Sequence, residues 1–218
     1  ADTLAGRIDF NTSKIKLPSL NAENLDIHQI YGIKIIACGT AAHAAQVGKY
    51  LIESIARIPV EVDIASEFRY RDPIIDKHHL VIAISQSGET ADTLAAMEEA
   101  RKKSALLWSI VNVIGSQAMR IADGFISMQV GPEIGVASTK AFTAPLVDLN
   151  LLAVFLADKK GILSYDARRE LINQISAVPE LVGGLLERER KIEEVAQRYK
   201  DISHILYIGR GINMPIAY

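Results

Sequence analysis

The sequence has a single cysteine, a single tryptophan and almost no net charge. One cysteine, Cys38, excludes an internal disulfide, and we expect a reducing, cytoplasmic setting. The formal net charge of −2 excludes the broad positive field that attracts nucleic acid or anionic lipid. We therefore predict neither a nucleic-acid nor a membrane partner. An anionic ligand would have to be held by local hydrogen-bond donors.

The chain also lacks several patterns that would assign a function directly. No apolar run reaches the roughly 18–20 residues that span a bilayer, and we expect no signal peptide. The nucleotide-binding pattern GxxxxGK[ST] is absent, and "GRGINM", 209–214, lacks the third glycine of the dinucleotide fingerprint. The adjacent His78 and His79 diverge on either a strand or a helix. We therefore expect no nucleotide cofactor and no metal site.

The sequence does contain a regular alternation of apolar runs and helical patterns. Apolar runs predict strands at 32–38, 59–65, 80–85, 106–113 and 124–130. Helical periodicity predicts helices at 41–56, 90–104 and 138–161. Such alternation is typical of βαβ units and a parallel sheet. We predict a three-layer α/β sandwich with a flavodoxin-like, five-stranded parallel sheet.

Segments outside this pattern suggest how the chain is organised. We expect an N-terminal arm at 1–30, in which Asn21 caps a short helix, and the α/β domain at 31–160. A charged helical connector follows at 161–203. Residues 204–218 are expected to begin a second domain, with a strand at 205–209. Both ends interrupt a pattern, so we expect the chain to be a piece of a longer protein.

Hydroxyl, amide and glycine residues follow the third predicted strand at once. The segment "SQSGET", 85–90, ends that strand and enters the next helix. Its glycine permits a sharp turn, and the first amides of a helix are unpaired at the positive end of the helix dipole. The side-chain donors are Ser85, Gln86, Ser87 and Thr90. We predict a metal-free phosphate site here, provided that the turn faces a cavity at the edge of the sheet. The alternative is that Ser87 only caps the helix.

Two further loops are expected at the same edge, since doubly wound sheets bind ligands at the carboxyl ends of their strands. "CGT" places Thr40 at a helix start, and "GPEIGVAST" places Ser138 just before another helix. We expect Ser138 to cap that helix or to contact substrate hydroxyls. Glu133 and Lys140 are candidates either for acid–base chemistry or for a structural role.

Four segments together resemble a known family. "CGT", "ASEFRYR", "ISQSGETADTL" and "GPEIGVASTKAFT" resemble the first sugar isomerase (SIS) domain of the isomerising glutamine–fructose-6-phosphate aminotransferases, which make glucosamine 6-phosphate. "SxSGxT" alone would indicate only the SIS superfamily, whereas "GVASTKAFT" indicates the aminotransferase branch. The resemblance implies fructose 6-phosphate and glucosamine 6-phosphate as ligands. It also implies a glutaminase domain and a second SIS domain as partners, and a homo-oligomer.

The resemblance assigns roles to particular residues. The implied substrate-binding residues are Thr40, Ser85, Gln86, Ser87, Thr90, Val136 and Ser138. Among these, the carbonyl of Val136 and the hydroxyl of Ser138 would contact the sugar. Ala41 stands where the family commonly has serine, so one hydroxyl contact is lost. The family motif with the catalytic glutamate and lysine is absent, so we expect no catalytic residue, no cofactor and no synthase activity in this chain alone.

Other functions remain open from the sequence. The chain could belong to a sugar-phosphate deaminase or isomerase of the same superfamily. It could also be a binding-only regulatory domain for sugar phosphates, although no DNA-binding helix-turn-helix is visible. Arg69 and Arg71 of "SEFRYR" could pair with phosphate or order a loop, and the sequence does not decide between these roles.

Overall fold

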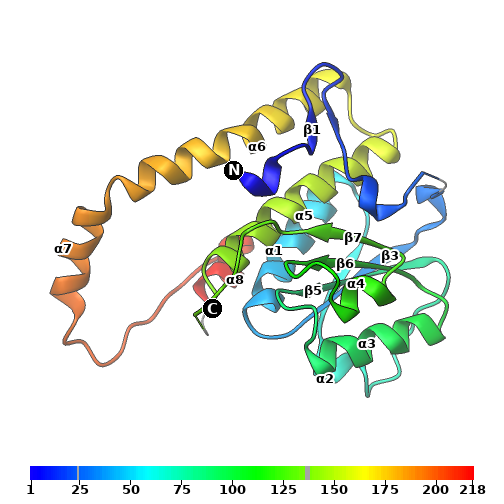
Figure 1. The fold of residues 1–218 in the computed structure, drawn as a ribbon, viewed down its shortest axis with the longest axis horizontal. Helices are drawn as coiled ribbons and strands as arrows, with labels where there is room; N and C mark the ends of the chain where they lie inside the picture. The colour runs from blue at the N-terminus through cyan, green and yellow to red at the C-terminus, as the bar shows by residue number, and fades with distance from the viewer. Residues whose placement is uncertain (24, 136–137) are drawn as a thin grey trace.

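The computed structural model describes residues 1–23, 25–135 and 138–218 (Figure 1). Within them, five strands form a parallel sheet in the order β4-β3-β5-β6-β7. The strands are β3 (Gly32–Ala37), β4 (Val60–Ile64), β5 (His79–Ser85), β6 (Leu106–Val111) and β7 (Gly124–Ser127). The predicted flavodoxin-like, five-stranded parallel sheet is confirmed.

Strand β5 is central because its apolar side chains are buried on both faces of the sheet. Leu80, Ile82 and Ile84 belong to one hydrophobic core, and Val81 and Ala83 belong to the other. A continuous apolar run is therefore required, since successive side chains of a strand alternate between faces. Both cores together make the sheet the middle layer of the sandwich.

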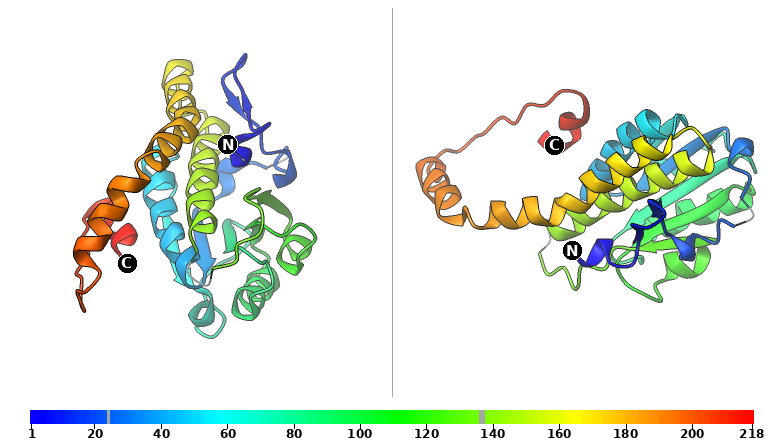
Figure 2. Two further views of the ribbon diagram at one scale, coloured as in Figure 1. Left: turned by 60° about the vertical axis from the view of Figure 1, so that its left-hand side comes forward. Right: turned by 90° about the horizontal axis from the view of Figure 1, so that it is seen from above.

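Helices cover both faces of the sheet (Figure 2). One face carries α1 (Thr40–Ile55) and α5 (Lys140–Lys159), and the other carries α2 (Ala65–Phe68), α3 (Ala91–Lys102) and α4 (Gln117–Ile121). By length and composition, α5 could cross a membrane, but 61% of its apolar window is buried inside the domain, as expected of a core helix. Its Leu149 packs so closely on α1 that a Cβ at Gly48 would lie 2.8 Å from the leucine side chain.

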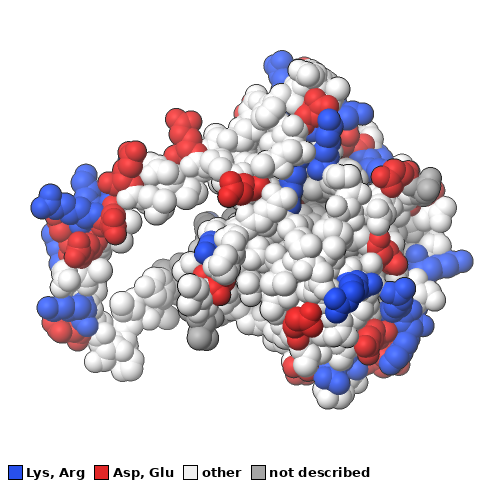
Figure 3. Space-filling model, viewed as in Figure 1, with Lys and Arg blue, Asp and Glu red and all other residues white. Residues whose placement is uncertain are grey.

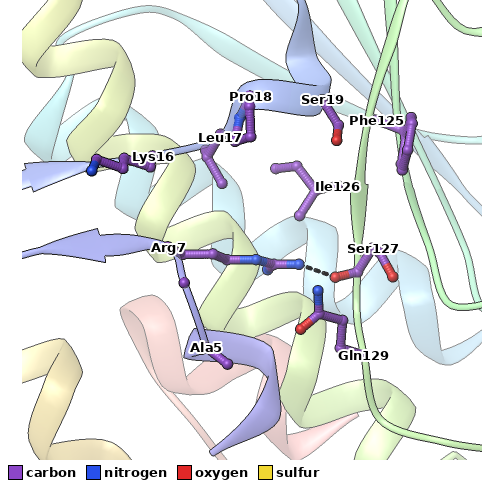
Figure 4. A pocket seen from close by; sticks show the side chains of 11 residues that line it. Ala5, Arg7, Lys16, Leu17, Pro18, Ser19, Phe125, Ile126, Ser127 and Gln129 are labelled. Carbon is purple, nitrogen blue, oxygen red and sulfur yellow. Dashed lines mark hydrogen bonds between the residues drawn. The ribbon is translucent and has the colours of Figure 1, made fainter.

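The N-terminal arm packs on the edge of the domain near β7. It contains short 3₁₀ helices and a hairpin, namely η1 (Asp2–Leu4), β1 (Ile8–Asp9), β2 (Lys14–Ile15), η2 (Pro18–Leu20) and η3 (Ile27–Gln29). The Arg7 side chain reaches from the arm to the carbonyl of Ser127 (Figure 4) and to the carboxylate of Asp148. Asn21 caps a short helix as predicted, at the C-terminal end of η2. Its backbone there is left-handed, φ 51°, a conformation that asparagine tolerates better than most residues.

Beyond the sheet domain the chain is helical and then irregular. Helices α6 (Tyr165–Leu186) and α7 (Glu189–Tyr199) lead to η4 (Gly211–Asn213) and α8 (Met214–Ala217). Basic and acidic side chains are interspersed over α7 (Figure 3). The strand predicted at 205–209 is wrong, since no strand is described there and Leu206 and Ile208 are each 86% exposed. A strand needs a neighbouring strand for its backbone hydrogen bonds, and the described residues offer none there. The chain then returns to α1, where the rings of Tyr218 and His43 stack at 5.8 Å.

Candidate functional site

The turns after β3 and β5 meet at the point where the winding of the sheet reverses. From β3 the chain moves to the edge strand β4, then returns to β5 on the opposite side of β3. Ligands of open α/β sheets bind at such a switch point. Ala37 and Ile84 are partners in register, so Thr40 and the turn 85–90 leave the same edge of the sheet. The structure thus brings the two predicted loops together.

The turn 85–90 is organised from within by its own hydroxyls. Ser85 is buried, and its Oγ accepts a hydrogen bond from the Gly88 amide at 3.0 Å and lies 3.2 Å from Thr90 Oγ1. Ser87 Oγ accepts from the Glu89 amide at 3.2 Å. Helix α3 begins after Thr90, its N-cap, so the alternative that Ser87 caps this helix is not what the structure shows. Ser85 therefore stabilises the conformation of the turn from its buried side.

The neighbouring connection from β6 to α4 fastens the turn from one side. The Asn112 amide donates to the Gln86 carbonyl at 3.1 Å, and the Ala118 amide donates to the Gly88 carbonyl at 3.0 Å. A side chain at Gly88 would collide with this neighbour, because φ is +67° and a Cβ would lie 2.2 Å from Ser116 Oγ. In these contacts the carbonyl oxygens of Gln86 and Gly88 act as hydrogen-bond acceptors. The first amides of α3 have no partner within the helix and stay available to an anion.

The predicted donors differ in their accessibility. Thr40, Gln86, Ser87 and Thr90 are half-buried, whereas Ser85 is only 5% exposed. Cavities of about 160, 280 and 240 Å³ lie beside the N-terminal arm or between α1 and the C-terminal segment, and residues 85–90 line none of these three. The cavity that the sequence hypothesis required at the turn is not among these three.

The loop before α5 is closed by an acidic side chain. Glu133 Oε2 accepts hydrogen bonds from the amides of Thr139 at 3.2 Å and Ala141 at 2.9 Å. The N-cap residue Thr139 makes no side-chain cap, so the predicted cap at Ser138 is wrong and Glu133 takes that role. Ser138 itself is half-buried just before the helix. Val136, the other predicted sugar contact, lies outside the described residues.

The same hydrogen bonds oppose a proton-transfer role for Glu133. The Ala141 amide above all, followed by the Thr139 amide and the charge of Lys140, lowers the pKa of Glu133 from its ordinary value of 4.5. An ionised carboxylate already engaged with two amides is a weak base. Lys140 is exposed in the first turn of α5. The structure therefore favours the structural role that the sequence left open for Glu133.

Sequence reasoning missed Asn112, which joins two loops of this edge. Its Oδ1 accepts from the Val130 amide at 3.1 Å, and its Nδ2 donates to the Gly131 carbonyl at 2.7 Å. Asn112 thereby ties the segment after β7 to the end of β6. The sequence did carry a signal for Asn112: it is a polar residue directly after the strand 106–111. The predicted donors likewise follow the carboxyl ends of strands.

The segment "SEFRYR" lies beside α3 and along β4. Arg69 pairs with Asp92 in the first turn of α3 at 2.9 Å, and Arg71 bridges Glu61 and Asp63 at 2.6 Å each. Lys34, and then Arg71, lowers the pKa of Glu61 by hydrogen bonding. Both arginines thus form ion pairs with carboxylates of this chain.

Comparison with known proteins agrees with this geometry. The family model of the SIS domain matches residues 27–155, which is more than half of the chain. The chain belongs to the SIS domain family. It is 49% identical over 216 residues to the isomerising glutamine–fructose-6-phosphate aminotransferase of Caldanaerobacter subterraneus and 45% identical to that of Clostridium tetani. These matches cover 99% of this chain but 35% of each relative, so the chain spans about a third of the relatives' length.

Solved structures show the same relationship. The C-terminal domain of glucosamine-fructose-6-phosphate aminotransferase from Francisella tularensis superposes with a TM-score of 0.91 at 36% identity, covering 99% of this chain and 60% of that one. Glucosamine-6-phosphate deaminase from Thermotoga maritima superposes with a TM-score of 0.58 at 20% identity, covering 83% of this chain and 54% of that one. The second likeness shows a shared fold alone.

Proposed function

We propose that the chain is the first SIS domain of an isomerising glutamine–fructose-6-phosphate aminotransferase, in which it holds the phosphate of the sugar. The observation that carries this proposal is the turn 85–90, a hydroxyl-rich bend fastened at the switch point of a parallel sheet. The aminotransferase relatives support the substrate class, since they match the chain over nearly its whole length. The deaminase alternative has only a shared fold in its favour.

The proposed clamp acts through hydrogen bonds and needs no metal. The first amides of α3 and the hydroxyls of Ser87 and Thr90 would donate to the phosphate oxygens, and Thr40 would approach from the neighbouring loop. Ser85 would act mainly by holding the Gly88 amide in place. Binding the phosphate end fixes the position of the reacting carbons, which lowers the entropic cost of the reaction.

The groups that move protons in this proposal lie outside the chain. A glutaminase domain would supply ammonia, and a second SIS domain would supply the base, within a cytoplasmic homo-oligomer. The chain alone would bind fructose 6-phosphate or glucosamine 6-phosphate weakly and form no product. Synthesis of glucosamine 6-phosphate by the purified chain would show that the base has been misplaced.

The clamp is tested by removing its two accessible hydroxyls. Ser87→Ala with Thr90→Ala should weaken binding of glucosamine 6-phosphate by at least about 100-fold, since each hydrogen bond to a charged group contributes about 1.5–3 kcal/mol. Isothermal titration calorimetry gives the affinity, and circular dichroism confirms the fold. Thr12→Ala with Ser54→Ala is the matched control, because Thr12 lies in the arm hairpin and Ser54 in the last turn of α1. Equal affinity of the clamp variant and the unmodified chain would refute the assignment.

A further inference from the structure

The proposed phosphate turn contains two carboxylates in addition to its donors. Glu89 lies inside the turn, and Asp92 lies in the first turn of α3. A phosphate dianion bound nearby would be repelled by both, because like charges at short range raise the free energy of the bound state. A usable anion site here requires that each carboxylate be engaged elsewhere or neutralised.

The carboxylate of Glu89 is engaged by a neighbouring connection. Its Oε1 accepts a hydrogen bond from the Gln117 amide at 2.7 Å. That amide belongs to the first residue of α4, in the connection that also fastens the Gly88 carbonyl. Glu89 is thereby held toward α4 and helps to fix the turn.

The carboxylate of Asp92 is neutralised by an arginine that is distant in sequence. Arg69 Nη1 lies 2.9 Å from Asp92 Oδ1, and the side chains are 32% and 43% exposed. The guanidinium also lies over the ring of Tyr70, 4.8 Å from its centroid. Both contacts hold the arginine beside the first turn of α3.

The position of Arg69 is fixed by the packing of the short helix that precedes it. Phe68, the last residue of α2, is fully buried in the same core as Leu94 and Met97 of α3. Arg69 follows directly, and its amide donates to the Ala65 carbonyl at 3.3 Å. The buried phenylalanine thus anchors the segment "SEFRYR" against α3.

We propose that Arg69 is a positioning residue of the phosphate site that acts through Asp92. By neutralising this carboxylate it lets the first turn of α3 present amides and a hydroxyl, without an opposing charge, to the phosphate. The inference rests on the proposed function and gives a role to the motif that the sequence left unassigned. It requires no contact between Arg69 and the ligand.

A double-variant cycle tests this role. Arg69→Ala should weaken glucosamine 6-phosphate binding about fivefold or more in low salt, because it exposes the site to one unpaired negative charge. Asp92→Asn alone should leave the affinity within about twofold. Asp92→Asn combined with Arg69→Ala should restore most of the loss, which a purely structural role for Arg69 would not allow.

Two controls complete the experiment. Lys102→Ala removes the same charge from the last turn of α3, where Lys102 pairs with Glu99, and should leave the affinity unchanged. Salt at about 0.5 M should reduce the effect of Arg69→Ala, because it shortens the range of charge interactions. Arg69→Lys should keep part of the affinity, and thermal unfolding checks that each variant is folded.

The outcomes separate the inference from the proposed function. If the unmodified chain binds glucosamine 6-phosphate and Arg69→Ala binds equally well, the inference fails and the proposed function stands. If the double variant stays as weak as Arg69→Ala, the role through Asp92 is wrong, and Arg69 either contacts the phosphate directly or only supports the fold. If the unmodified chain binds no sugar phosphate, both are overturned.

Discussion

Asp148 makes the stability of this domain depend on pH in a direction unusual for a carboxylate. It lies in α5 with no exposed surface, and its Oδ2 has no hydrogen-bond partner among the described residues. Its Oδ1 pairs with Arg7 of the N-terminal arm. Burial raises the pKa of Asp148 to about 7, and the guanidinium of Arg7 opposes the rise only in part.

The direction of the pH dependence depends on whether the folded or the unfolded state binds the Asp148 proton more tightly. Asp148 has an ordinary pKa of 3.8 and a folded pKa of about 7, so between these values the folded state binds more protons than the unfolded state. The contribution of Asp148 to stability is therefore complete below pH 3.8 and is lost as the pH rises through 7. The difference corresponds to about 4 kcal/mol.

Urea unfolding between pH 4 and pH 8 measures this contribution. The unmodified chain should lose stability as the pH rises, and Asp148→Asn should not. The difference in free energy of unfolding, variant minus unmodified chain, should therefore increase by about 3–4 kcal/mol from pH 4 to pH 8. Asp9→Asn is the matched control. Asp9 is half-buried, and its pKa is lowered to about 2 chiefly by a hydrogen bond from Lys16, so in the folded state it does not titrate in this range. Parallel curves for Asp148→Asn and the unmodified chain would refute the reasoning.

Removing the partner tests the same pair from the other side. Arg7→Met leaves the carboxylate of Asp148 buried and unpaired, which should cost about 3–5 kcal/mol at pH 8. The cost should be smaller at pH 5, because a protonated Asp148 carries no charge. Replacing both residues, Arg7→Met with Asp148→Leu, should restore most of the stability. An equal loss for Arg7→Met at both pH values would contradict a charged Asp148 at pH 8.

Two further predictions concern the helices that frame the site. Gly48→Ala should destabilise the domain by up to about 2 kcal/mol in urea unfolding, because overpacking against Leu149 outweighs the gain of about 1 kcal/mol in helix propensity. Gly184→Ala, with no atom within 4 Å of its Cβ, should instead stabilise the chain, and a stabilising Gly48→Ala would contradict the packing. The pKa of Glu133 is lowered, so its ionised carboxylate stabilises the folded state above pH 4.5, and this stabilisation is lost as the pH falls through the lowered pKa. Glu133→Gln has no such group, so its unfolding temperature should fall less steeply on acidification below pH 4.5. The measurement is the unfolding temperature from pH 3 to pH 6, and an unchanged acid limb would refute the cap at Glu133.

The sheet was predictable because its determinants are local. The run 80–85 is apolar at every position up to Ser85, so it had to be buried on both faces, and β5 is the central strand. The ends of strands were less predictable, since they depend on neighbours. Strand β7 ends at Ser127, and not at 130, because Gln129 has a left-handed backbone and Asn112 captures the next amide. The apolar run 205–209 is not a strand, because the part of the chain that the structure describes offers it no neighbouring strand to pair with.

The candidate site was predictable in its location but not in its internal bonds. The rule for switch points places the turns after β3 and β5 together without any knowledge of side chains. The pairing of Arg69 with Asp92, 23 residues later, depends on how deeply Phe68 is buried, and the sequence pattern does not give that. The cap of α5 by Glu133 likewise requires the loop to fold back over several residues.

The hydrogen bonds of the turn explain why it is rich in hydroxyls although Ser85 is buried and Ser87 and Thr90 are only half exposed. Ser85 and Ser87 each accept a hydrogen bond from an amide of the turn itself, at positions where a regular helix has not yet begun. Without these acceptors the amides would need water, and the bend would sample other conformations. A preformed bend loses less entropy when it binds its ligand. Ser85 would thus mainly prepare the site. Ser87, Thr90 and the first turn of α3, with Asp92 neutralised by Arg69, would bind the phosphate.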